Sequence, residues 1–491
     1  MQDGDRAISY NDFLDVRNII FEMTNACNMR CSYCFEEEAC KQNKTGMISW
    51  PIIQRAIDSV IIQENEHYMV TFFGGEPLLN KELIFKTIAY AKNVAGKYSS
   101  YVSFNMVTNA TCLDSQTISS LNAEDVYLFV SFDGDRALQD RYRRMMDGRS
   151  SYETVLENLK ELIFSREAMN CKDNMAVRMT VTKDGIEQLV DRYQFLCRLG
   201  CCKITFALVS SDRKRPYAIG TEDFPLLRKV YWKLADLFIE EVESGKLHNR
   251  FFQSLVKKIT DGVHCNHFCD CGKRYLGVGI DGDIYPCEGF FGLKQFSTGN
   301  ILGKRNSRNG NTLECVSNHP FCKQCWARYL CGGGCYHEAW MRTGNVNKKD
   351  AVICETYRIA VEAALYIYEK LKQRGLLSVF LSLAEEQLSD SAVPVLWQAN
   401  CKQQGTLLYS VTEEFSYFIE LDEMSEFIVS LCDGKHTLSE IVSILLDLYE
   451  CEAETLYRDV CHLLNDLHDH KAIYFVNEAV DIPNFGCLDS K

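Results

Sequence analysis

The sequence predicts an α/β protein built on a partial (β/α)6 barrel, followed by a cysteine-rich domain and a small winged-helix-like α+β domain. Three observations lead to this fold class. Between residues 19 and 209 short apolar runs alternate with helical patterns, which favours parallel strands joined by helical crossovers. Cysteines gather between residues 265 and 354. From residue 393 to 476 two strand-like runs precede three segments with helical apolar spacing.

Six strands are expected in the first half of the chain, because each apolar run there has the length of a strand. Their residues are 19–24, 68–73, 101–108, 126–132, 175–182 and 203–209. Helices are expected to begin near Ser49, with Pro51 in the first turn, and near Ser151. In such barrels the reactive side chains lie at the C-terminal ends of the strands. The motifs in this half of the chain are found there.

Composition and charge exclude several functions. The 491 residues carry a formal net charge of -14 without a sustained basic stripe, so no nucleic-acid partner is expected. Residues 1–6 are acidic and polar, unlike a secretory signal, and no apolar run is long enough to cross a bilayer. We therefore expect a cytoplasmic protein without a membrane partner. In a reducing compartment the 24 cysteines indicate metal or redox chemistry.

Three closely spaced cysteines, Cys27, Cys31 and Cys34, follow the first expected strand. A 4Fe–4S cluster is normally held by four thiolates, so three clustered cysteines would leave one iron open to a small molecule. A zinc site or three incidental buried cysteines would be the alternatives. The Cys-x3-Cys-x2-Cys spacing, with Tyr33 before the last cysteine, resembles the signature of the radical S-adenosylmethionine (SAM) enzymes. In that family the open iron binds SAM, and an electron from the cluster cleaves SAM to a 5′-deoxyadenosyl radical.

The ends of the next strands carry further segments of this resemblance. The residues at 74–77 spell Gly-Gly-Glu-Pro, whose two glycines let the backbone approach a ligand, as in the family's segment for the SAM amino group. Residues 107–109 and 131–134 are similar to its TNG and SxDG segments, although Ala110 replaces the usual glycine. An ion pair within the barrel is the alternative role for Arg178, on the fifth strand. The resemblance implies these SAM-binding residues: Tyr33 near the adenine, Ser131 and Arg178 at the carboxylate, and Gly74, Gly75, Glu76, Pro77 and Asn109.

The second cysteine region has a regular spacing. It comprises Cys271-x10-Gly282-x4-Cys287, then Cys322-x2-Cys325-x5-Cys331-x3-Cys335, and a last Cys354. This pattern resembles the SPASM extension of radical SAM peptide-modifying enzymes, which carries two auxiliary 4Fe–4S clusters. A zinc ribbon is the alternative for the CxxC pair alone. Cysteines elsewhere, such as Cys197, are expected to be core or surface thiols.

The resemblance implies a ligand set for each auxiliary cluster. Auxiliary cluster I would take Cys265, Cys271, Cys287 and Cys335. Auxiliary cluster II would take Cys322, Cys325, Cys331 and Cys354. Cys269 could replace Cys265 or Cys271, and the spacing does not decide between them. With the first motif, the implied cofactors are three 4Fe–4S clusters and SAM.

The last region is predicted to form a short sheet, with strands at 407–411 and 415–421, and three helices at 424–431, 438–448 and 453–467. Thr437-x2-Glu440 is a capping box for the second helix. The segments at 420–423, 432–438 and 458–460 look like the PqqD-like peptide-recognition domain, in which a leader peptide adds a strand to the sheet edge. A plain C-terminal cap or a dimerisation domain is the alternative.

The expected domain order follows from these segments. It is a radical SAM partial barrel at 1–210, a helical bridge at 211–262 with an apolar stripe from Leu226 to Phe238, and a SPASM domain at 263–375. A linker at 376–392 and a PqqD-like domain at 393–480 complete the chain.

The resemblances imply an oxidoreductase that modifies a ribosomally made precursor peptide, whose leader the C-terminal domain binds. In relatives the commonest product is a thioether between a cysteine sulfur and a carbon, and carbon–carbon crosslinks come next. An electron donor such as flavodoxin or ferredoxin would be a second partner.

Two other functions remain open at this point. An anaerobic sulfatase-maturating enzyme, which makes formylglycine from Cys or Ser, has the same barrel and clusters, with an Asp as base directly after the G-x4-C cysteine. Glu288 takes that place here and is the candidate catalytic base. A non-catalytic iron–sulfur scaffold or sensor would give the segments at 74–77 and 131–134 no role.

Overall fold

The computed structural model describes residues 6–7, 10–35, 46–64, 66–169, 171, 174–305, 313–384, 393–396, 401–404, 406–410, 418–449, 451–469 and 472–476. The chain divides into two compact units. The larger unit comprises residues 1–62, 68–95 and 102–380, and the smaller one comprises 63–67, 96–101 and 381–491. None of the described helices is both long and apolar enough to span a bilayer.

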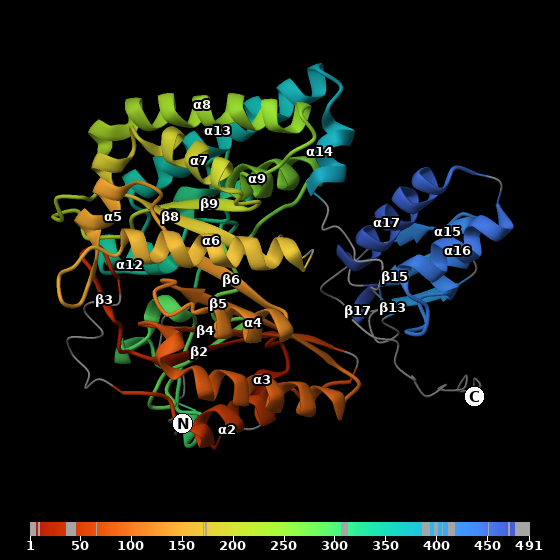
Figure 1. Cartoon of the computed structure of the whole chain (residues 1–491), viewed down its shortest axis with the longest axis horizontal. Coiled ribbons are helices and arrows are strands. Elements are labelled where there is room, and N and C mark those ends of the chain that lie inside the picture. Colours follow the sequence, from red (N-terminus) through yellow and green to blue (C-terminus); the bar gives the residue numbers. More distant parts are fainter. Residues whose placement is uncertain are drawn as a thin grey trace. The chain divides into compact units, whose positions relative to one another are not determined.

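A sheet of eight strands forms the centre of the larger unit, in the order β11-β10-β2-β4-β5-β6-β8-β9 (Figure 1). Its strands are β2 (Asn18–Thr24), β4 (His67–Gly74), β5 (Tyr101–Thr108), β6 (Val126–Ser131), β8 (Met175–Val181), β9 (Ile204–Leu208), β10 (Tyr275–Val278) and β11 (Ile284–Tyr285). The six strands predicted from the apolar runs are β2, β4, β5, β6, β8 and β9, and the predicted α/β fold class is confirmed.

The sheet continues beyond the predicted strands into the second cysteine region. Strand β10 pairs in parallel with β2, with Tyr275 opposite Asn18, and β11 pairs antiparallel with β10. Strands as short as β10 and β11 leave little periodic signal in a sequence. The cysteine-rich region therefore shares the sheet of the barrel.

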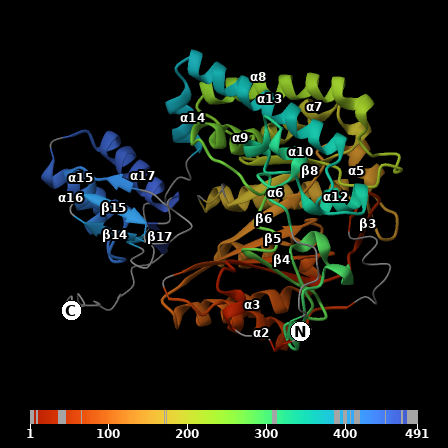
Figure 2. The same cartoon turned by 180° about the vertical axis from the view of Figure 1, so that it is seen from behind.

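Helices cover one face of the sheet (Figure 2). Helix α2 (Trp50–Val60) packs on β2, α4 (Ser115–Ala123) on β6 and α7 (Leu189–Leu199) on β9. Along β5 and β6 every second residue is buried while the residues between them stay partly accessible. One face of the sheet is thus closed by helices and the other retains access, as a barrel lumen that binds a ligand requires.

Helix α6 (Tyr152–Ala168) buries Val155, Leu159 and Leu162, as its apolar spacing predicts. It also buries Arg166, which is 0% exposed and donates hydrogen bonds from Nε to Asn122 Oδ1 at 3.0 Å and from Nη2 to the Val126 carbonyl at 2.8 Å. The two serines expected to begin α2 and α6 are at the predicted positions but do not cap these helices. Ser49 and Ser151 stand at the N-terminal boundaries of α2 and α6, but neither side chain makes a capping bond.

The bridge segment forms α8 (Phe224–Glu243) and α9 (Arg250–Thr260). Helix α8 packs along α13 (Ala351–Gln373), which carries Cys354, the last cysteine of the second region. The buried stripe of α8 begins at Leu227, whereas Leu226 is only half-buried. Helix α14 (Leu377–Ala384) occupies part of the stretch expected to be a linker.

The smaller unit holds two sheets and three helices. Strand β13 (Val393–Leu396) pairs antiparallel with β17 (Ile473–Val476), and β14 (Cys401–Gln404), β15 (Leu407–Ser410) and β16 (Phe418–Glu420) form a second sheet. The three predicted helices are present as α15 (Glu423–Ser430), α16 (Leu438–Leu448) and α17 (Ala453–Asp469). The capping box also forms, because the Glu440 N–H donates to Thr437 Oγ1 at 3.2 Å and the Thr437 N–H donates to Glu440 Oε2 at 2.8 Å. The expected start of the second strand, at 415–417, lies outside the described residues.

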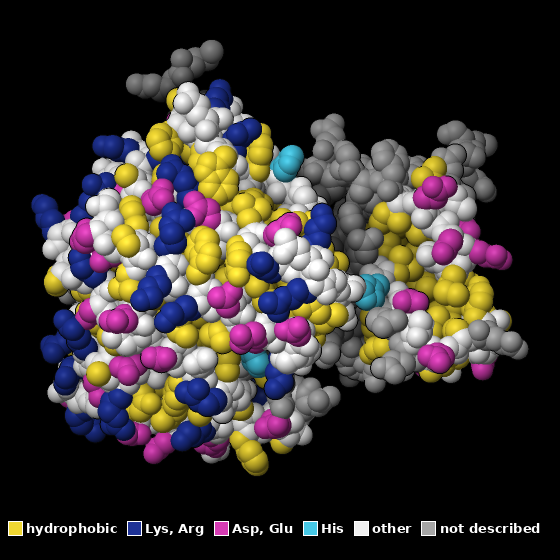
Figure 3. Space-filling model, turned by 90° about the horizontal axis from the view of Figure 1, so that it is seen from above, with side chains coloured by type: hydrophobic (Ala, Val, Ile, Leu, Met, Phe, Trp, Pro, Cys, Tyr) yellow, Lys and Arg dark blue, Asp and Glu magenta, His cyan; other side chains and the backbone are white. Residues whose placement is uncertain are grey.

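On the face of the larger unit drawn in Figure 3, Lys and Arg side chains are interspersed with Asp and Glu.

A buried carboxylate joins the barrel to the cysteine-rich region. Glu22, in β2, is 7% exposed, and its Oε2 accepts a hydrogen bond from the Ile280 N–H at 3.1 Å. Burial raises the pKa of Glu22 from 4.5 to about 7, although the bond from Ile280 opposes this change. The carboxyl group is therefore easiest to bury while it is protonated.

We expect Glu22→Gln to stabilise the protein at pH 8 more than at pH 5. The folded state retains a proton that the unfolded chain loses between pH 4.5 and 7, so the wild type loses stability as the pH rises through that window. The neutral amide avoids a loss on the order of 2 kcal/mol. Thermal unfolding midpoints of the two proteins at both pH values test this, and an equal shift at both would contradict it.

Candidate active site

The first three cysteines lie where the chain leaves β2. Cys27 follows that strand, Cys31 ends β3 (Met29–Cys31), and Cys34 lies in the turn beyond, whose N–H donates to the Cys31 carbonyl at 3.2 Å. Strand β3 pairs antiparallel with β7 (Arg143–Met145), so that Cys31 stands opposite Arg143. The Cys34 thiol is exposed and the other two are partly buried.

The donors around these thiols suit an iron–sulfur cluster. The Met29 N–H and the Asn109 side-chain amide donate to Cys27 Sγ at 3.4 and 3.7 Å, and burial raises the pKa of the Cys27 thiol to about 12. Donors to a sulfur that must carry negative charge are what a cluster thiolate requires.

The glycine-rich turn after β4 presses against the chain that leads into the cysteines. The Gly75 N–H donates to the Thr24 carbonyl at 2.8 Å and the Glu76 N–H donates to the Ala26 carbonyl at 2.9 Å. A Cβ atom on Gly75 would lie 2.2 Å from the Ala26 oxygen, and one on Gly74 equally close to the Thr24 oxygen. Only glycine permits this approach, which fixes the turn directly beside the cysteine loop.

The Glu76 carboxylate accepts hydrogen bonds from neighbouring groups of the protein. It is 0% exposed and accepts hydrogen bonds from the Leu78 N–H at 3.2 Å, Thr108 Oγ1 at 2.8 Å and the Asn109 N–H at 2.7 Å. Burial raises its pKa to about 7, and these bonds lower it. A carboxylate has about four acceptor positions, so most of this side chain's capacity ties the turn to the end of β5.

Asn109 connects β5 with the cysteine loop. Besides contacting Cys27 Sγ, its Nδ2 donates to Asn28 Oδ1 at 3.0 Å, and its Oδ1 accepts from the Thr111 N–H at 2.9 Å. The next residue, Ala110, has a φ of +63°, in the left-handed region. This conformation costs a residue with a Cβ about 1 kcal/mol, a cost that a glycine would avoid.

Tyr33 belongs to a buried polar network. Its hydroxyl donates to Asp133 Oδ2 at 2.7 Å and accepts from Arg143 Nη1 at 3.3 Å. Burial by itself would lower the pKa of Arg143, but Tyr33, Cys31 and Asp133 raise it well above its usual value. The guanidinium is therefore a permanent cation beside the cysteine loop, and its Nε makes no hydrogen bond to the described residues. Arg143 gave no signal in the sequence, because only the β3–β7 pairing brings it to Cys31.

Ser131 and Arg178 lie opposite each other on β6 and β8. Both are on the accessible face, since Ser131 is partly exposed and Arg178 is exposed while its neighbours Val177 and Met179 are fully buried. Glu288 begins the short helix η5 (Glu288–Phe290), where burial raises its pKa and the charge of Arg178 opposes that rise. Glu288 thus lies within electrostatic range of the barrel lumen, although it comes from the cysteine-rich region.

Aromatic rings join this turn to the first motif. The Phe35 ring lies 5.3 Å from the His337 ring and 6.3 Å from the Phe73 ring, measured between centroids. A Cβ atom on Gly289 would lie 2.8 Å from His337 Cγ, so the turn is seated on the imidazole. Burial lowers the pKa of His337 to about 4, so the ring is neutral. His337 was not identified from the sequence, where a single histidine carries no pattern.

The second cysteine region forms two groups of thiols. In the first, the neighbouring thiols of Cys269 and Cys287 raise the pKa of Cys271. Burial raises the pKa of Cys335, and the charges of Cys287 and Cys269 add to this effect. Cys269, Cys271, Cys287 and Cys335 therefore act on one another. The Cys265 N–H donates to the Tyr329 carbonyl at 2.8 Å.

The second group consists of the four other cysteines of the pattern. Burial raises the pKa of Cys331 to about 11, and the neighbouring thiols of Cys322 and Cys325 add to this effect. Burial also raises the pKa of Cys354 to about 12, with further contributions from Cys331 and Cys322. The charges of these thiols therefore act on one another.

We expect Gly75→Ala to reduce the iron bound by the protein. The new methyl group would force the turn away from the Ala26 carbonyl and displace the segment that carries Cys27, at a cost of about 1–3 kcal/mol. Gly96→Ala is the matched control, because a Cβ there meets nothing within 4 Å. Iron per chain after anaerobic reconstitution measures the effect, and equal iron in both variants would contradict it.

Comparisons with known proteins agree with this arrangement. The model of the radical SAM superfamily matches residues 21–193, and the model of coenzyme PQQ synthesis protein D (PqqD) matches residues 407–473. Among curated proteins, the chain is 22% identical to a cysteine-type anaerobic sulfatase-maturating enzyme of Clostridium novyi, over 69% of this chain and 92% of that protein. It is also 22% identical to the radical SAM cyclopropyl synthase TigE of Paramaledivibacter caminithermalis, over 70% of this chain and 73% of that protein.

Solved structures show the same fold. The chain matches anSMEcpe with bound AdoMet with a TM-score of 0.63 and 20% identity, over 74% of this chain and 98% of that chain. It matches anSMEcpe with bound AdoMet and the Kp18Cys peptide with a TM-score of 0.60 and 21% identity, over 72% and 98% of the two chains. The fold, the segments at the strand ends and the two matched families lead to one conclusion. The chain contains a radical SAM domain at residues 21–193 and a PqqD-like C-terminal domain at residues 407–473.

Proposed function

We propose that this enzyme modifies a ribosomally made precursor peptide and forms a thioether between a cysteine sulfur and a carbon of another residue. The observation that carries the proposal is the PqqD-like match at 407–473 in the same chain as a radical SAM domain. A domain of this kind has a clear use when the substrate is a peptide that must be held by a segment away from the reacting residue. A soluble electron donor such as flavodoxin or ferredoxin would be the second partner.

Cys27, Cys31 and Cys34 are proposed to hold the cluster that binds SAM. When bound, the cluster and SAM supply a 5′-deoxyadenosyl radical that removes a hydrogen atom from the substrate. Since Glu76 bonds mainly within the protein, the backbone carbonyls of residues 74–77 are the proposed acceptors for the SAM ammonium. The roles proposed for the remaining residues are positioning of the loop by Asn109, contact with the carboxylate by Ser131 and Arg178, and contact near the adenine by Tyr33.

Two auxiliary 4Fe–4S clusters are proposed for the second cysteine region, which makes three in all. The proposed ligands of auxiliary cluster I are Cys269, Cys271, Cys287 and Cys335, with Cys269 in place of Cys265. This choice is supported by the effect of Cys269 on the pKa values of both Cys271 and Cys335. The proposed ligands of auxiliary cluster II are Cys322, Cys325, Cys331 and Cys354.

Glu288 is the proposed general base. A buried carboxylate with a raised pKa is suited to take a proton from a substrate thiol as the carbon–sulfur bond forms. The electron left after removal of the hydrogen atom and the proton would pass to an auxiliary cluster. Its position directly after Cys287, within the field of Arg178, would keep it next to both a cluster ligand and the barrel lumen. The guanidinium favours the ionised form that a base needs at the start of the reaction.

The smaller unit is proposed to bind the leader part of the peptide. In its three-stranded sheet β14 and β16 each have one neighbour among the described strands, so each offers an edge to which an extended peptide could add. Main-chain hydrogen bonds would give affinity along such an edge, and the side chains of the helices would select the sequence.

A second candidate function is formylglycine formation on a sulfatase-derived peptide. It is favoured by the Glu288 carboxylate and by the match to sulfatase-maturating enzymes over most of their length. The PqqD-like domain at 407–473 has no evident use in that reaction.

Co-expression with a small cysteine-containing peptide encoded beside this gene tests the proposed function. We expect mass spectrometry to show the loss of two hydrogens per crosslink, and we expect this loss to disappear when the chain is truncated after residue 392. Retention of SAM cleavage by the truncated protein is the control for folding. Conversion of a sulfatase-derived peptide to an aldehyde, with no change in the neighbouring peptide, would favour the second candidate instead.

We expect Glu288→Gln to lower the rate of product formation by about 10²–10⁴-fold, because a neutral amide cannot accept the proton. SAM cleavage without peptide should stay near the wild-type rate, since the proposed base acts only on the substrate. Glu314→Gln, at an exposed carboxylate of the same region, is the matched control. Unchanged product formation by Glu288→Gln would rule out this role.

A further inference from the structure

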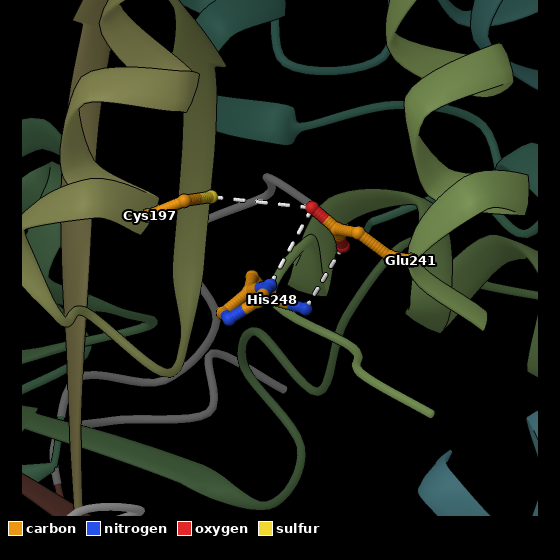
Figure 4. Close-up of side chains that lie close together, drawn as sticks. All are labelled: Cys197, Glu241 and His248. Atoms are coloured by element: carbon orange, nitrogen blue, oxygen red, sulfur yellow. Dashed lines mark hydrogen bonds and ion pairs between the residues drawn. The ribbon is translucent and has the colours of Figure 1, made fainter. Parts of the chain in front are cut away.

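Three side chains with metal-binding atoms meet away from both cysteine regions. Cys197 lies near the end of α7, Glu241 in the last turn of α8, and His248 in the segment that leads from α8 to α9 (Figure 4). One sulfur, one carboxylate oxygen and one imidazole nitrogen from them all lie within 4.8 Å of one another. In Figure 4 the three side chains point toward a common centre from three separate segments.

The distances between these atoms resemble those around a tetrahedral zinc ion. Cys197 Sγ lies 3.9 Å from Glu241 Oε1, and His248 Nδ1 lies 3.5 Å from the same oxygen. Zinc binds nitrogen and oxygen at about 2.0–2.1 Å and sulfur at about 2.3 Å, which places tetrahedral ligands roughly 3.3–3.7 Å apart. Shifts of a few tenths of an ångström would bring the three atoms onto one ion.

Neighbouring groups hold the carboxylate and the imidazole in place. The Tyr193 hydroxyl donates to Glu241 Oε1, and the backbone N–H of His248 donates to Glu241 Oε2 at 3.1 Å. The His248 carbonyl in turn accepts from the Ile204 N–H of β9 at 2.7 Å. Ligands that are oriented by hydrogen bonds from a surrounding shell are typical of protein zinc sites.

The hydrogen bonds within the group leave one polar atom unused. His248 Nδ1 is buried and makes no hydrogen bond to any residue that the structure describes. The contact from the Cys197 thiol is long, at 3.9 Å, and a thiol is a weak donor. A buried nitrogen that makes no hydrogen bond is costly, and the 3.5 Å contact of Nδ1 with Glu241 Oε1 does not qualify as one, so packing alone does not account for the arrangement.

We propose that Cys197, Glu241 and His248 bind one Zn²⁺ through Sγ, Oε1 and Nδ1, with water at the fourth position. The Cys197 proton would pass to solvent, so one thiolate and one carboxylate would balance the charge of the ion. The three donor types match those zinc accepts, and a three-ligand set leaves an open position. The ion would fasten the end of α7 to the connection between α8 and α9.

X-ray absorption at the zinc edge of the iron-loaded enzyme tests the site without any substitution. The protein is reconstituted with iron and sulfide, treated with a mild chelator and then equilibrated with ZnCl₂. We expect one tightly held zinc with a single sulfur neighbour and the remaining neighbours nitrogen or oxygen. Zinc with three or four sulfur neighbours would instead occupy vacant cluster cysteines and would overturn the proposal, as would the absence of retained zinc.

Elemental analysis of variants provides the second measurement. Cys197→Ser and His248→Gln should each lose about one zinc per chain relative to wild type while retaining the wild-type iron content, because the cluster cysteines are elsewhere. Cys202→Ser is the matched control, since it removes a cysteine just beyond α7 that is not in the group. Wild-type zinc in Cys197→Ser and His248→Gln would contradict the assignment.

Discussion

The close backbone contact between the turn at 74–77 and the start of the cysteine loop is the constraint on which the rest of the site depends. Two N–H groups of the turn bond to the carbonyls of Thr24 and Ala26, and glycine at position 75 is the only residue that fits there. Because the turn is also fixed to β5 through Glu76, the cysteine loop is held from two strands at once. A loop that must present three thiols in one geometry benefits from this preorganisation.

Charge is arranged around the same loop. Arg143 is a buried cation opposite Cys31. It donates a hydrogen bond to the Tyr33 hydroxyl, which in turn donates to the Asp133 carboxylate, so the negative charge of Asp133 lies near the guanidinium. Three thiolates add negative charge to a poorly solvated place, and a permanent guanidinium nearby lowers the cost of holding it. The same reasoning explains why Asp133 accepts bonds from both Tyr33 and the Thr180 N–H, since a buried carboxylate must be satisfied.

The sequence was sufficient for features that depend on local pattern and insufficient for those that depend on long-range pairing. The six barrel strands, the helices of the smaller unit and the Thr437 capping box each have a periodic or positional signal. Strand β10 has four residues and pairs with β2, more than 250 residues earlier, so the local sequence does not predict this pairing. The roles of Arg143 and His337 likewise could not be predicted from the sequence, because each depends on contacts between distant segments. The choice between Cys265 and Cys269 depends on which thiol the chain turns inward, which spacing does not encode.

The pairing of β10 with β2 has a consequence for the chemistry. Because β10 and β11 extend the barrel sheet, the turn that carries Glu288 follows directly from β11. Strand β11 pairs with β10, and β10 pairs in register with β2, the strand that leads to Cys27. Gly289 in this turn packs against His337, and the His337 ring contacts the ring of Phe35. These contacts connect the turn to the residue directly after Cys34. The separation between Glu288 and Arg178 is therefore set by sheet register and ring packing within one unit, not by a flexible joint between a barrel and an added domain. A base that acts on a radical-derived substrate needs that rigidity, because an error of about 1 Å in its position can lower the rate by about 10²-fold.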